Sequence, residues 1–232
     1  MKLLGTGLSG LVGSRIVALL SQHTFTNFSL ENGVDITDSA SITPRITGDT
    51  DSPWVLHLAA YTNVQQAEAD ALLGENSTAW KVNVAATQTL VDACRITGKH
   101  LLYIDTDYAF DGAKDVYSEE DTPHPLGWYA KTKSEGAIAA AIDALMSRQA
   151  SGIYHVVGSE ALSPYIAAGI VAKTYGLDEA LVKPTTFASY FAGKAPIPQK
   201  AVLTNGKIRA LGVSMRGFAD GVSEMKRQEE NS

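Results

Sequence analysis

Three things are scarce in this sequence, and each shortage narrows what the chain can be. Cys94 is the only cysteine in 232 residues, so no internal disulfide and no cysteine-based metal site is expected. No apolar run approaches the ~20 residues that cross a bilayer. Basic residues form no block and the net charge is -6, which disfavours a nucleic-acid surface. These shortages favour a reducing, cytoplasmic setting with no membrane or nucleic-acid partner and no metal.

Apolar residues are present in an ordinary proportion, 45%, which is enough to bury a large core. The length suits one large domain, or a nucleotide-binding domain with a smaller companion. Cys94 lies in the helical pattern VDACRITG, where we expect a small buried thiol of the core and not a nucleophile.

Glycine is concentrated at the start of the chain, where residues 1–18 read MKLLGTGLSGLVGSRIVA. The four glycines of this stretch are Gly5, Gly7, Gly10 and Gly13. They match both G-x-G-x-x-G and T-G-x-x-G-x-x-G, the pattern of a strand that turns into a helix. The first turn of such a helix has unpaired N–H groups that bind an anion such as a pyrophosphate. The alternatives are a flexible glycine loop and a signal peptide, and Arg15 argues against the second.

The next segments predict a second strand and the other end of a dinucleotide site. Residues 25–30 alternate apolar and polar side chains like a short strand. Glu31 follows, ~20 residues after Gly10, where a carboxylate accepts hydrogen bonds from an adenosine ribose. A surface glutamate fits as well, and Arg15 would favour a 2′-phosphate, so the choice between NAD and NADP stays open. In VDITD, Asp35 falls at a turn and Asp38 at a helix N-cap.

Two further strands and a long helix continue the alternation. Residues 54–62 form an unbroken apolar strand, as in a sheet covered on both faces. His57 within it is expected to be a hydrogen-bonded core residue. Residues 75–96 show helical spacing, and Asn83 among them either bonds the neighbouring strand or turn, or faces solvent. Residues 101–106 form the fourth strand.

Alternating strands and helices predict a doubly wound parallel sheet, with the ligand at the carboxyl ends of the strands. Thr106 falls at one such end. Glu68, between two of the strands, belongs to an acidic region that we expect to be solvated. The polar segment 107–127 is long for a plain connection and is interpreted as a functional loop.

Tyr129 and Lys133 follow that loop and are four residues apart, so they share one face of a helix. A nearby ammonium is expected to lower the pKa of the Tyr129 phenol and so let it exchange protons with a substrate oxygen. A surface Tyr–Lys pair is the alternative. A glycine loop at the start and a hydroxyl at a strand end favour the functional interpretation.

Together these segments resemble an extended short-chain dehydrogenase/reductase, and within that superfamily the dTDP-4-dehydrorhamnose reductase family. The stretches that carry the resemblance are TGLSGLVG, VDITD, LAAYTNVQQAE, VNVAATQTL, DTDYAFDG, PLGWYAKTKSEG and APIPQKAVLTNGKI. DTDYAFDG followed by Y-x-x-x-K is the most specific part. The resemblance implies a Rossmann-like α/β fold with a small C-terminal substrate-side domain, and NAD(P)H-dependent reduction of a 4-keto nucleotide sugar in deoxysugar biosynthesis.

The resemblance also implies a role for each candidate residue. Tyr129 would protonate the C4 oxygen of the sugar, Thr106 would bond the same oxygen, and Lys133 would hold the cofactor ribose. Gly7, Gly10 and Gly13 would face the pyrophosphate. The residues expected to hold NADP(H) or NAD(H) are Gly7, Leu8, Ser9, Gly10, Leu11, Val12, Glu31, Asp35, Ile36, Leu58, Ala59, Ala60, Tyr61, Asn83, Tyr129 and Lys133.

Two relatives of that family give the alternatives: nucleotide-sugar epimerases, and the regulatory subunit of methionine adenosyltransferase, which binds and does not reduce. A homodimer is left open. The expected division is a dinucleotide-binding domain at 1–150 and a substrate-side region at 151–232. In the latter we expect a strand at 151–158, helices at 162–175 and 215–227, and a loop-rich segment at 178–207.

The resemblance breaks after Gly136. The family carries several tens of residues there, whereas this chain has the alanine-rich segment 137–150. One helix over 129–149 would be over ~30 Å long, and a strand of about six residues spans only ~20 Å. Because such a helix would overshoot the sheet, the sequence predicts a missing family segment, with Gly136 and Ala137 not directly bonded.

Overall fold

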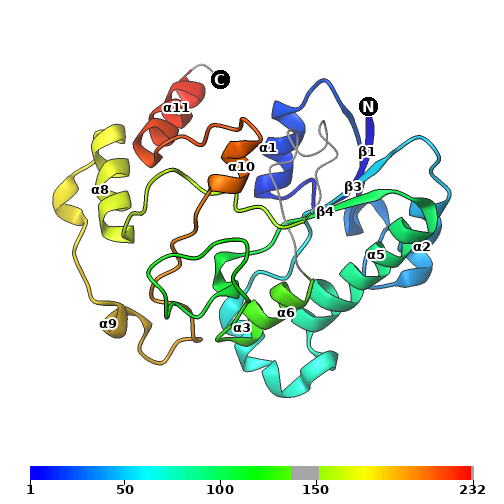
Figure 1. The fold of residues 1–232 in the computed structure, drawn as a ribbon, viewed down its shortest axis with the longest axis horizontal. Helices are drawn as coiled ribbons and strands as arrows, with labels where there is room; N and C mark the ends of the chain where they lie inside the picture. The colour runs from blue at the N-terminus through cyan, green and yellow to red at the C-terminus, as the bar shows by residue number, and fades with distance from the viewer. Residues whose placement is uncertain (137–151, 231–232) are drawn as a thin grey trace.

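A computed structural model of the chain describes residues 1–136 and 152–230. Its centre is a four-stranded parallel sheet in the order β2-β1-β3-β4 (Figure 1). The strands are β1 (Lys2–Thr6), β2 (Thr24–Phe28), β3 (Trp54–His57) and β4 (His100–Tyr103). The helices that connect them are α1 (Leu11–Leu19), η1 (Leu30–Asn32), α2 (Ser39–Thr47), α3 (Val64–Ala69), η2 (Ala71–Asn76), α4 (Thr78–Trp80), η3 (Lys81–Ala85) and α5 (Ala86–Thr97).

The sheet is covered on both faces because neighbouring residues of each strand point to opposite sides. Leu4 of β1 and Val55 of β3 pack with Ile42 and Ile46 of α2 and with Leu90 of α5. On the other face Leu3, Leu56 and Leu102 pack with α1. The predicted doubly wound Rossmann-like fold is confirmed, and it directs the carboxyl ends of all four strands to one edge.

Strands β3 and β4 are both shorter than predicted, and side chains from neighbouring helices explain why. The expected strand 54–62 ends at His57, because the Asn83 side chain bonds the backbone N–H and carbonyl of Tyr61. The expected strand 101–106 ends at Tyr103, and the Ile104 carbonyl accepts a hydrogen bond from Lys133 instead of from a strand.

The predicted helix 75–96 begins at Thr78, after the Ser77 hydroxyl accepts a hydrogen bond from the N–H of Trp80. It contains the π-helical turn η3 and ends at Gly98, which adopts a left-handed conformation. Asp38 caps α2 by accepting from the N–H of Ala40, as VDITD predicted.

Beyond β4 the chain forms η4 (Asp107–Ala109), a loop, and α6 (Trp128–Gly136). The C-terminal elements are α8 (Pro164–Tyr175), η5 (Glu179–Leu181), α9 (Phe187–Phe191), α10 (Gly206–Ala210) and α11 (Phe218–Glu230). Helices α8 and α11 pack against each other on the side of the molecule away from α2 and α5 (Figure 1). Both predicted C-terminal helices are therefore present, each starting two or three residues late. The Gly136–Ala137 junction and segment 137–151 lie outside the described residues.

The expected strand at 151–158 is wrong over residues 152–158, which form no strand. Side chains satisfy backbone groups there instead of a strand ladder. The N–H of His155 donates to the Glu119 carboxylate (2.9 Å), and the Asn205 amide donates to the carbonyls of Val157 and Gly158. In residues 1–136 and 152–230, no helix is both long and apolar enough to span a bilayer.

Candidate active site

The glycine loop between β1 and α1 is shaped by close backbone contacts. Gly7 has a φ of 70°, and a Cβ there would lie 2.5 Å from the N of Ala59. A Cβ at Gly13 would overlap the Gly7 carbonyl oxygen. At Gly10 the nearest atom to a Cβ is the Gly7 carbonyl oxygen, 3.3 Å away. Gly7 and Gly13 are therefore needed by the loop itself, whereas a Cβ at Gly10 would make one tight contact without overlap.

The first turn of α1 is open to a ligand. Gly10 is the N-cap residue and provides no side-chain cap. Leu11 is 92% exposed and Val12 is 55% exposed, and Ser9 is exposed as well. Leu8 is buried, and its N–H donates to the Asn27 side chain (3.2 Å), which anchors the loop on β2. The open N–H groups and the positive end of the helix fit a pyrophosphate.

The residues after β2 and β3 border the same edge of the sheet. Glu31 in η1 is exposed. The Asp35 carboxylate accepts hydrogen bonds from the N–H and hydroxyl of Thr37, which hold its pKa below the usual value. Ile36 is half-buried. Arg15 donates to Gln228 of α11, so its guanidinium is bound to the C-terminal helix.

Leu58, Ala59 and Ala60 are partly exposed and lead from β3 to Tyr61. The Leu58 N–H donates to the Thr6 carbonyl (3.0 Å), which keeps this segment against the glycine loop. Asn83 is fully buried in η3. Its side chain accepts from the N–H of Tyr61 (2.8 Å) and donates to the hydroxyl of Thr132 in α6 (3.1 Å). The expectation that Asn83 bonds a neighbouring turn is confirmed.

His57 is buried and hydrogen-bonded at both ring nitrogens, as expected for a core histidine. Nδ1 lies 2.7 Å from the Thr6 hydroxyl and Nε2 lies 2.9 Å from the Thr87 hydroxyl. Because the Thr87 hydroxyl donates to the Asn83 carbonyl, it accepts from Nε2 of a neutral ring. Burial, with the Lys133 charge, lowers the pKa of His57 to about 3. His57 thus joins the end of β1 to α5 as a neutral residue.

The three candidate catalytic residues meet beyond the carboxyl end of β4. Thr106 caps η4: its hydroxyl accepts from the N–H of Tyr108 (3.4 Å) and donates to the Asp107 carboxylate (3.3 Å), and it lies close enough to Tyr129 to lower the pKa of that phenol. The Tyr129 ring packs edge-on against Tyr108, with 6.3 Å between the ring centroids. Lys133 is only 3% exposed; its Nζ donates to the Ile104 carbonyl (2.6 Å) and lies 4.0 Å from the centre of the Tyr103 ring.

The predicted lowering of the Tyr129 pKa is wrong for this structure. Burial raises the pKa of Tyr129, the Asp105 carboxylate raises it further, and only the Thr106 side chain opposes them. Burial lowers the pKa of Lys133 to about 8, against the charge of Asp105. The Lys133 ammonium donates to the Ile104 carbonyl and lies over the Tyr103 ring. It therefore does not stabilise a Tyr129 phenolate.

Helix α6 is fixed at its start by residues that the sequence did not single out. The Glu68 carboxylate of α3 accepts a hydrogen bond from the N–H of Trp128 (2.7 Å), so Glu68 is not solvated as predicted. The Trp128 indole donates to the Ser77 hydroxyl (3.1 Å) and stacks on Trp80. Sequence spacing gives no signal for this contact, because it joins positions 60 residues apart.

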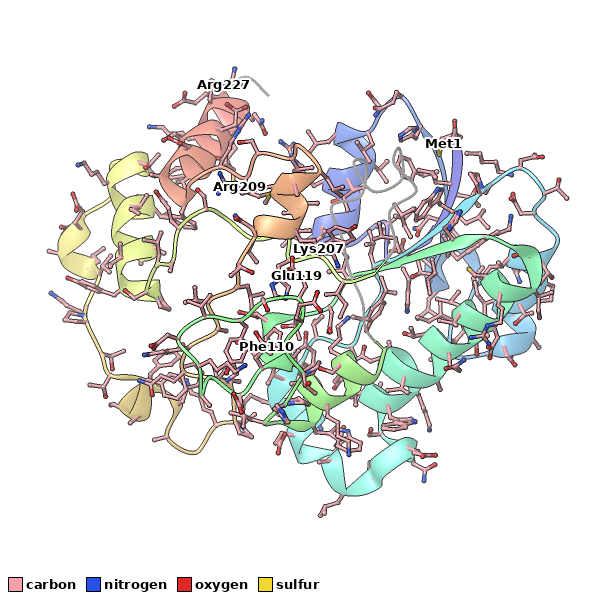
Figure 2. The ribbon with its side chains drawn as sticks, viewed as in Figure 1. Met1, Phe110, Glu119, Lys207, Arg209 and Arg227 are labelled. Carbon is pink, nitrogen blue, oxygen red and sulfur yellow. The ribbon has the colours of Figure 1, made fainter. Side chains whose placement is uncertain are left out.

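The loop 107–127 is held against the C-terminal part of the chain. The N–H of Tyr117 donates to the Val202 carbonyl, and the N–H of Thr204 to the Tyr117 carbonyl. Phe110 packs edge-on against His155, and Glu119 binds the His155 backbone. Figure 2 shows Phe110 and Glu119 in the middle of the molecule, near Lys207 of α10. Within the described ranges, no group of three or more His, Cys, Asp or Glu side chains is arranged to hold a metal.

Comparison with protein families gives a match to the family described as the RmlD substrate binding domain. It covers residues 1–142 and, in a second match, residues 136–230. The two matches overlap around the Gly136–Ala137 junction, where the sequence departs from the resemblance.

Comparison with individual proteins gives relatives of two kinds. The chain is 37% identical over 139 residues to dTDP-4-dehydrorhamnose reductase of Aggregatibacter actinomycetemcomitans, which covers 58% of this chain and 45% of that protein. It is 29% identical over 143 residues to methionine adenosyltransferase 2 subunit beta of Mus musculus, covering 58% of this chain and 41% of that protein. The chain therefore spans less than half the length of these curated relatives.

Solved structures share the fold. The dTDP-4-dehydrorhamnose reductase of Bacillus anthracis, in complex with NADP, superposes with a TM-score of 0.84 at 19% identity, covering 98% of this chain and 99% of that one. The DesIV dTDP-glucose 4,6-dehydratase of Streptomyces venezuelae, with NAD bound, gives 0.75 at 18% identity, covering 100% and 98%.

Proposed function

Because the chain belongs to the RmlD substrate-binding-domain family, we propose that it is an NAD(P)H-dependent reductase of a 4-keto nucleotide sugar in deoxysugar biosynthesis. A relative named dTDP-4-dehydrorhamnose reductase is 37% identical to it over 139 residues. A nicotinamide cofactor is supported by two neighbours in fold, whose structures hold NADP and NAD.

One observation carries the proposal: the hydroxyl groups of Thr106 and Tyr129 lie near each other beyond the carboxyl end of β4. Two hydroxyl groups that lie together can both bond one substrate oxygen, one as a proton donor and one as a fixed partner. Lys133 is buried on the same helix, and the open first turn of α1 lies at the same edge of the sheet. In doubly wound folds this edge is where the ligand binds.

The cofactor, when bound, supplies a hydride to the C4 carbon of the sugar. The C4 oxygen then needs one proton, which Tyr129 gives from its hydroxyl while Thr106 holds the same oxygen. Because the pKa of Tyr129 is raised, this side chain is a neutral phenol at neutral pH and has the proton to give. Lys133 would hold the nicotinamide ribose. To do so, its Nζ would give up the hydrogen bond to the Ile104 carbonyl and donate to the ribose instead.

The remaining residues divide between the two ends of the site. The loop residues Gly7, Leu8, Ser9, Gly10, Leu11 and Val12 would hold the pyrophosphate, and Glu31, Asp35 and Ile36 the adenosine side. Leu58, Ala59, Ala60 and Tyr61 would line the path between them, with Asn83 fixing Tyr61. Residues 1–150 would form the dinucleotide domain and 151–232 the substrate side. We place the reaction in the cytoplasm, and a homodimer remains a prediction for sedimentation.

The direct test is NAD(P)H oxidation, followed by absorbance, against a panel of 4-keto nucleotide sugars. Turnover of at least one sugar, lost in Tyr129→Phe, is the expected result. Oxidation of no sugar by a folded protein that binds NADPH would refute the reductase and favour the alternative below.

The second candidate is a regulatory subunit that binds the cofactor without reduction. It is favoured by the similarity to methionine adenosyltransferase 2 subunit beta and by the division of the family match into two parts that overlap at residues 136–142, where substrate-contacting segments would be lost. The two functions differ in turnover. A regulatory subunit binds the cofactor with either Tyr129 or its replacement, and it reduces no sugar in either form.

A further inference from the structure

Asp105 is a buried carboxyl group in the candidate site to which no role has been given so far. It lies between Ile104, whose carbonyl binds Lys133, and Thr106, which lies close to Tyr129. Its Oδ1 is enclosed by the protein and has no hydrogen-bond partner in residues 1–136 and 152–230. An unpaired carboxylate oxygen in such a place is costly unless a nearby cation compensates for it.

Lys133 supplies that charge from the adjacent position: its Nζ is bound to the carbonyl of Ile104 (2.6 Å), the residue before Asp105, and forms no direct ion pair with the Asp105 carboxylate. The Asp105 carboxylate raises the pKa of Lys133, and the Lys133 ammonium in turn lowers the pKa of Asp105. The other titratable groups around the carboxyl are Asp107 in η4, Tyr129 in α6 and Tyr103 in β4. Asp107 is the only other acid among them. The two tyrosines are neutral at neutral pH, so within residues 1–136 and 152–230 Lys133 is the positive charge that acts on Asp105.

We propose that Asp105 is a positioning residue of this site, whose carboxylate acts through Lys133 and keeps the ammonium charged beside the Ile104 carbonyl. The inference deepens the proposed function and rests on it only for the kinetic part of its test. Asp105 need not touch substrate or cofactor, because its effect reaches the reaction through the charge of Lys133.

The electrostatics of the three groups are consistent with this role. Burial raises the pKa of Asp105 to about 6, against its hydrogen bond with the Thr106 backbone and the Lys133 charge. Asp105 is therefore ionised at neutral pH. Burial lowers the pKa of Lys133 to about 8, and Asp105 is the group that opposes this lowering. Without the carboxylate, Lys133 would lose its proton at lower pH.

Replacing Asp105 by a neutral residue is expected to lower the pKa of Tyr129 as well as that of Lys133. Asp105 raises the pKa of Tyr129, so a neutral residue at position 105 lowers it. Loss of either proton, from the Lys133 ammonium or from the Tyr129 phenol, removes the form that the reaction needs. The alkaline limit of activity must then move to lower pH in Asp105→Asn.

The first test needs no turnover. Lysine labelled with ¹³C at Cε reports the Lys133 ammonium by NMR in the cofactor-free protein, and Lys133→Arg assigns its signal. The Lys133 midpoint should move to lower pH in Asp105→Asn and return towards the wild-type value in Asp105→Glu. Asp51→Asn, an exposed site at the opposite end of β3, removes the same charge and should leave the midpoint unchanged. If Asp105→Asn fails to fold, Asp105→Ser takes its place.

The second test is the pH profile of kcat for the same variants. The alkaline limb should move to lower pH by about half a unit or more in Asp105→Asn, and not in Asp51→Asn. A Lys133 midpoint that is equal in wild type and Asp105→Asn overturns the inference, whether or not the chain reduces a sugar. A shifted midpoint in a chain that reduces no sugar supports the inference and contradicts the proposed function alone.

Discussion

Tyr129 is surrounded by groups that keep its proton in place. Burial, Asp105, Tyr108 and Asp107 all raise the pKa of its phenol, and only the Thr106 side chain opposes them. A phenol held in this way suits the reductive direction, because the step needs a donor that is protonated before hydride transfer begins.

Replacing Tyr129 by Phe should therefore lower kcat by ~10²–10⁴-fold, the usual contribution of general acid catalysis. The volume is nearly unchanged and the Tyr108 ring contact remains, so the fold should survive. Tyr165→Phe in α8 is the matched control, because that side chain is about half exposed and lies on another helix. A Tyr129→Phe protein that keeps most of its turnover would remove Tyr129 from the mechanism.

Gly10 offers a residue-scale test of the cofactor loop that Gly7 does not. Its φ of -73° suits any residue, and a Cβ meets only the Gly7 carbonyl at 3.3 Å, so Gly10→Val should fold. The valine side chain would stand where the pyrophosphate approaches the first turn of α1. Calorimetry should show strongly weakened NADPH binding, with Gly169→Ala in α8 binding as wild type does. Unchanged affinity in Gly10→Val would place the cofactor elsewhere.

At the scale of elements, the position of α6 depends on its first turn. The Glu68 carboxylate accepts from the Trp128 N–H and lies at the positive end of the helix dipole. Glu68→Ala removes this cap and should lower the free energy of unfolding by about 0.5–2 kcal/mol, as loss of an N-cap does. Urea unfolding measures the change. Glu75→Ala, at an exposed position, should cost less than about 0.5 kcal/mol, and equal losses in both variants would show that Glu68 does not cap α6.

Most elements of the sheet half could be predicted because their signals are local. Apolar runs indicated β1, β3 and β4, and Asp38, Gly98 and the glycine loop marked where helices begin or end. The strand ends could not be predicted, since they depend on Asn83 and Lys133 reaching backbone groups that are distant in sequence. The expected strand at 151–158 fails over residues 152–158 for the same reason, because Glu119 and Asn205, which are distant in sequence, bond the backbone there.

The candidate site was predictable in its residues but not in its electrostatics. Spacing placed Tyr129 and Lys133 on one helix face, and the resemblance added Thr106. The direction of the Tyr129 pKa was wrong because it depends on burial and on Asp105, which only the folded chain brings together. Asp105 and Glu68 lie within DTDYAFDG and LAAYTNVQQAE, but neither stretch indicates a role for them, because the groups they act on, Lys133 and the Trp128 N–H, are distant in sequence.

At the scale of the whole molecule, an ion-pair cluster at the end of the sheet opposite the site couples stability to pH. Asp49 binds Lys2 (2.6 Å) and Lys99 (3.3 Å), and its carboxylate also accepts from the N–H of Ser52. Burial alone would raise the pKa of Asp49, but these partners outweigh it and hold the pKa well below the usual value.

A lowered pKa in the folded state means that this stabilisation is fully present above the unfolded pKa of ~3.9 and is lost as pH falls below it. Thermal unfolding followed from pH 7 to pH 2 should therefore show Asp49→Asn less stable than wild type at neutral pH, with the difference shrinking below pH ~4. A difference in Tm that stays constant across this range would contradict the role given to the cluster.

The central claim is that this chain moves a hydride to C4 of a nucleotide sugar with Tyr129 as the proton donor. The most direct measurement uses NADPH carrying deuterium at the transferring position, a dTDP-4-keto-6-deoxy sugar, and mass and NMR analysis of the sugar recovered. If Tyr129 is the proton donor of a reductase, we expect one deuterium at C4 of the product with the wild-type protein, and a rate of labelling ~10²–10⁴-fold lower with Tyr129→Phe. A wild-type protein that binds NADPH and transfers no deuterium to any 4-keto nucleotide sugar would contradict it.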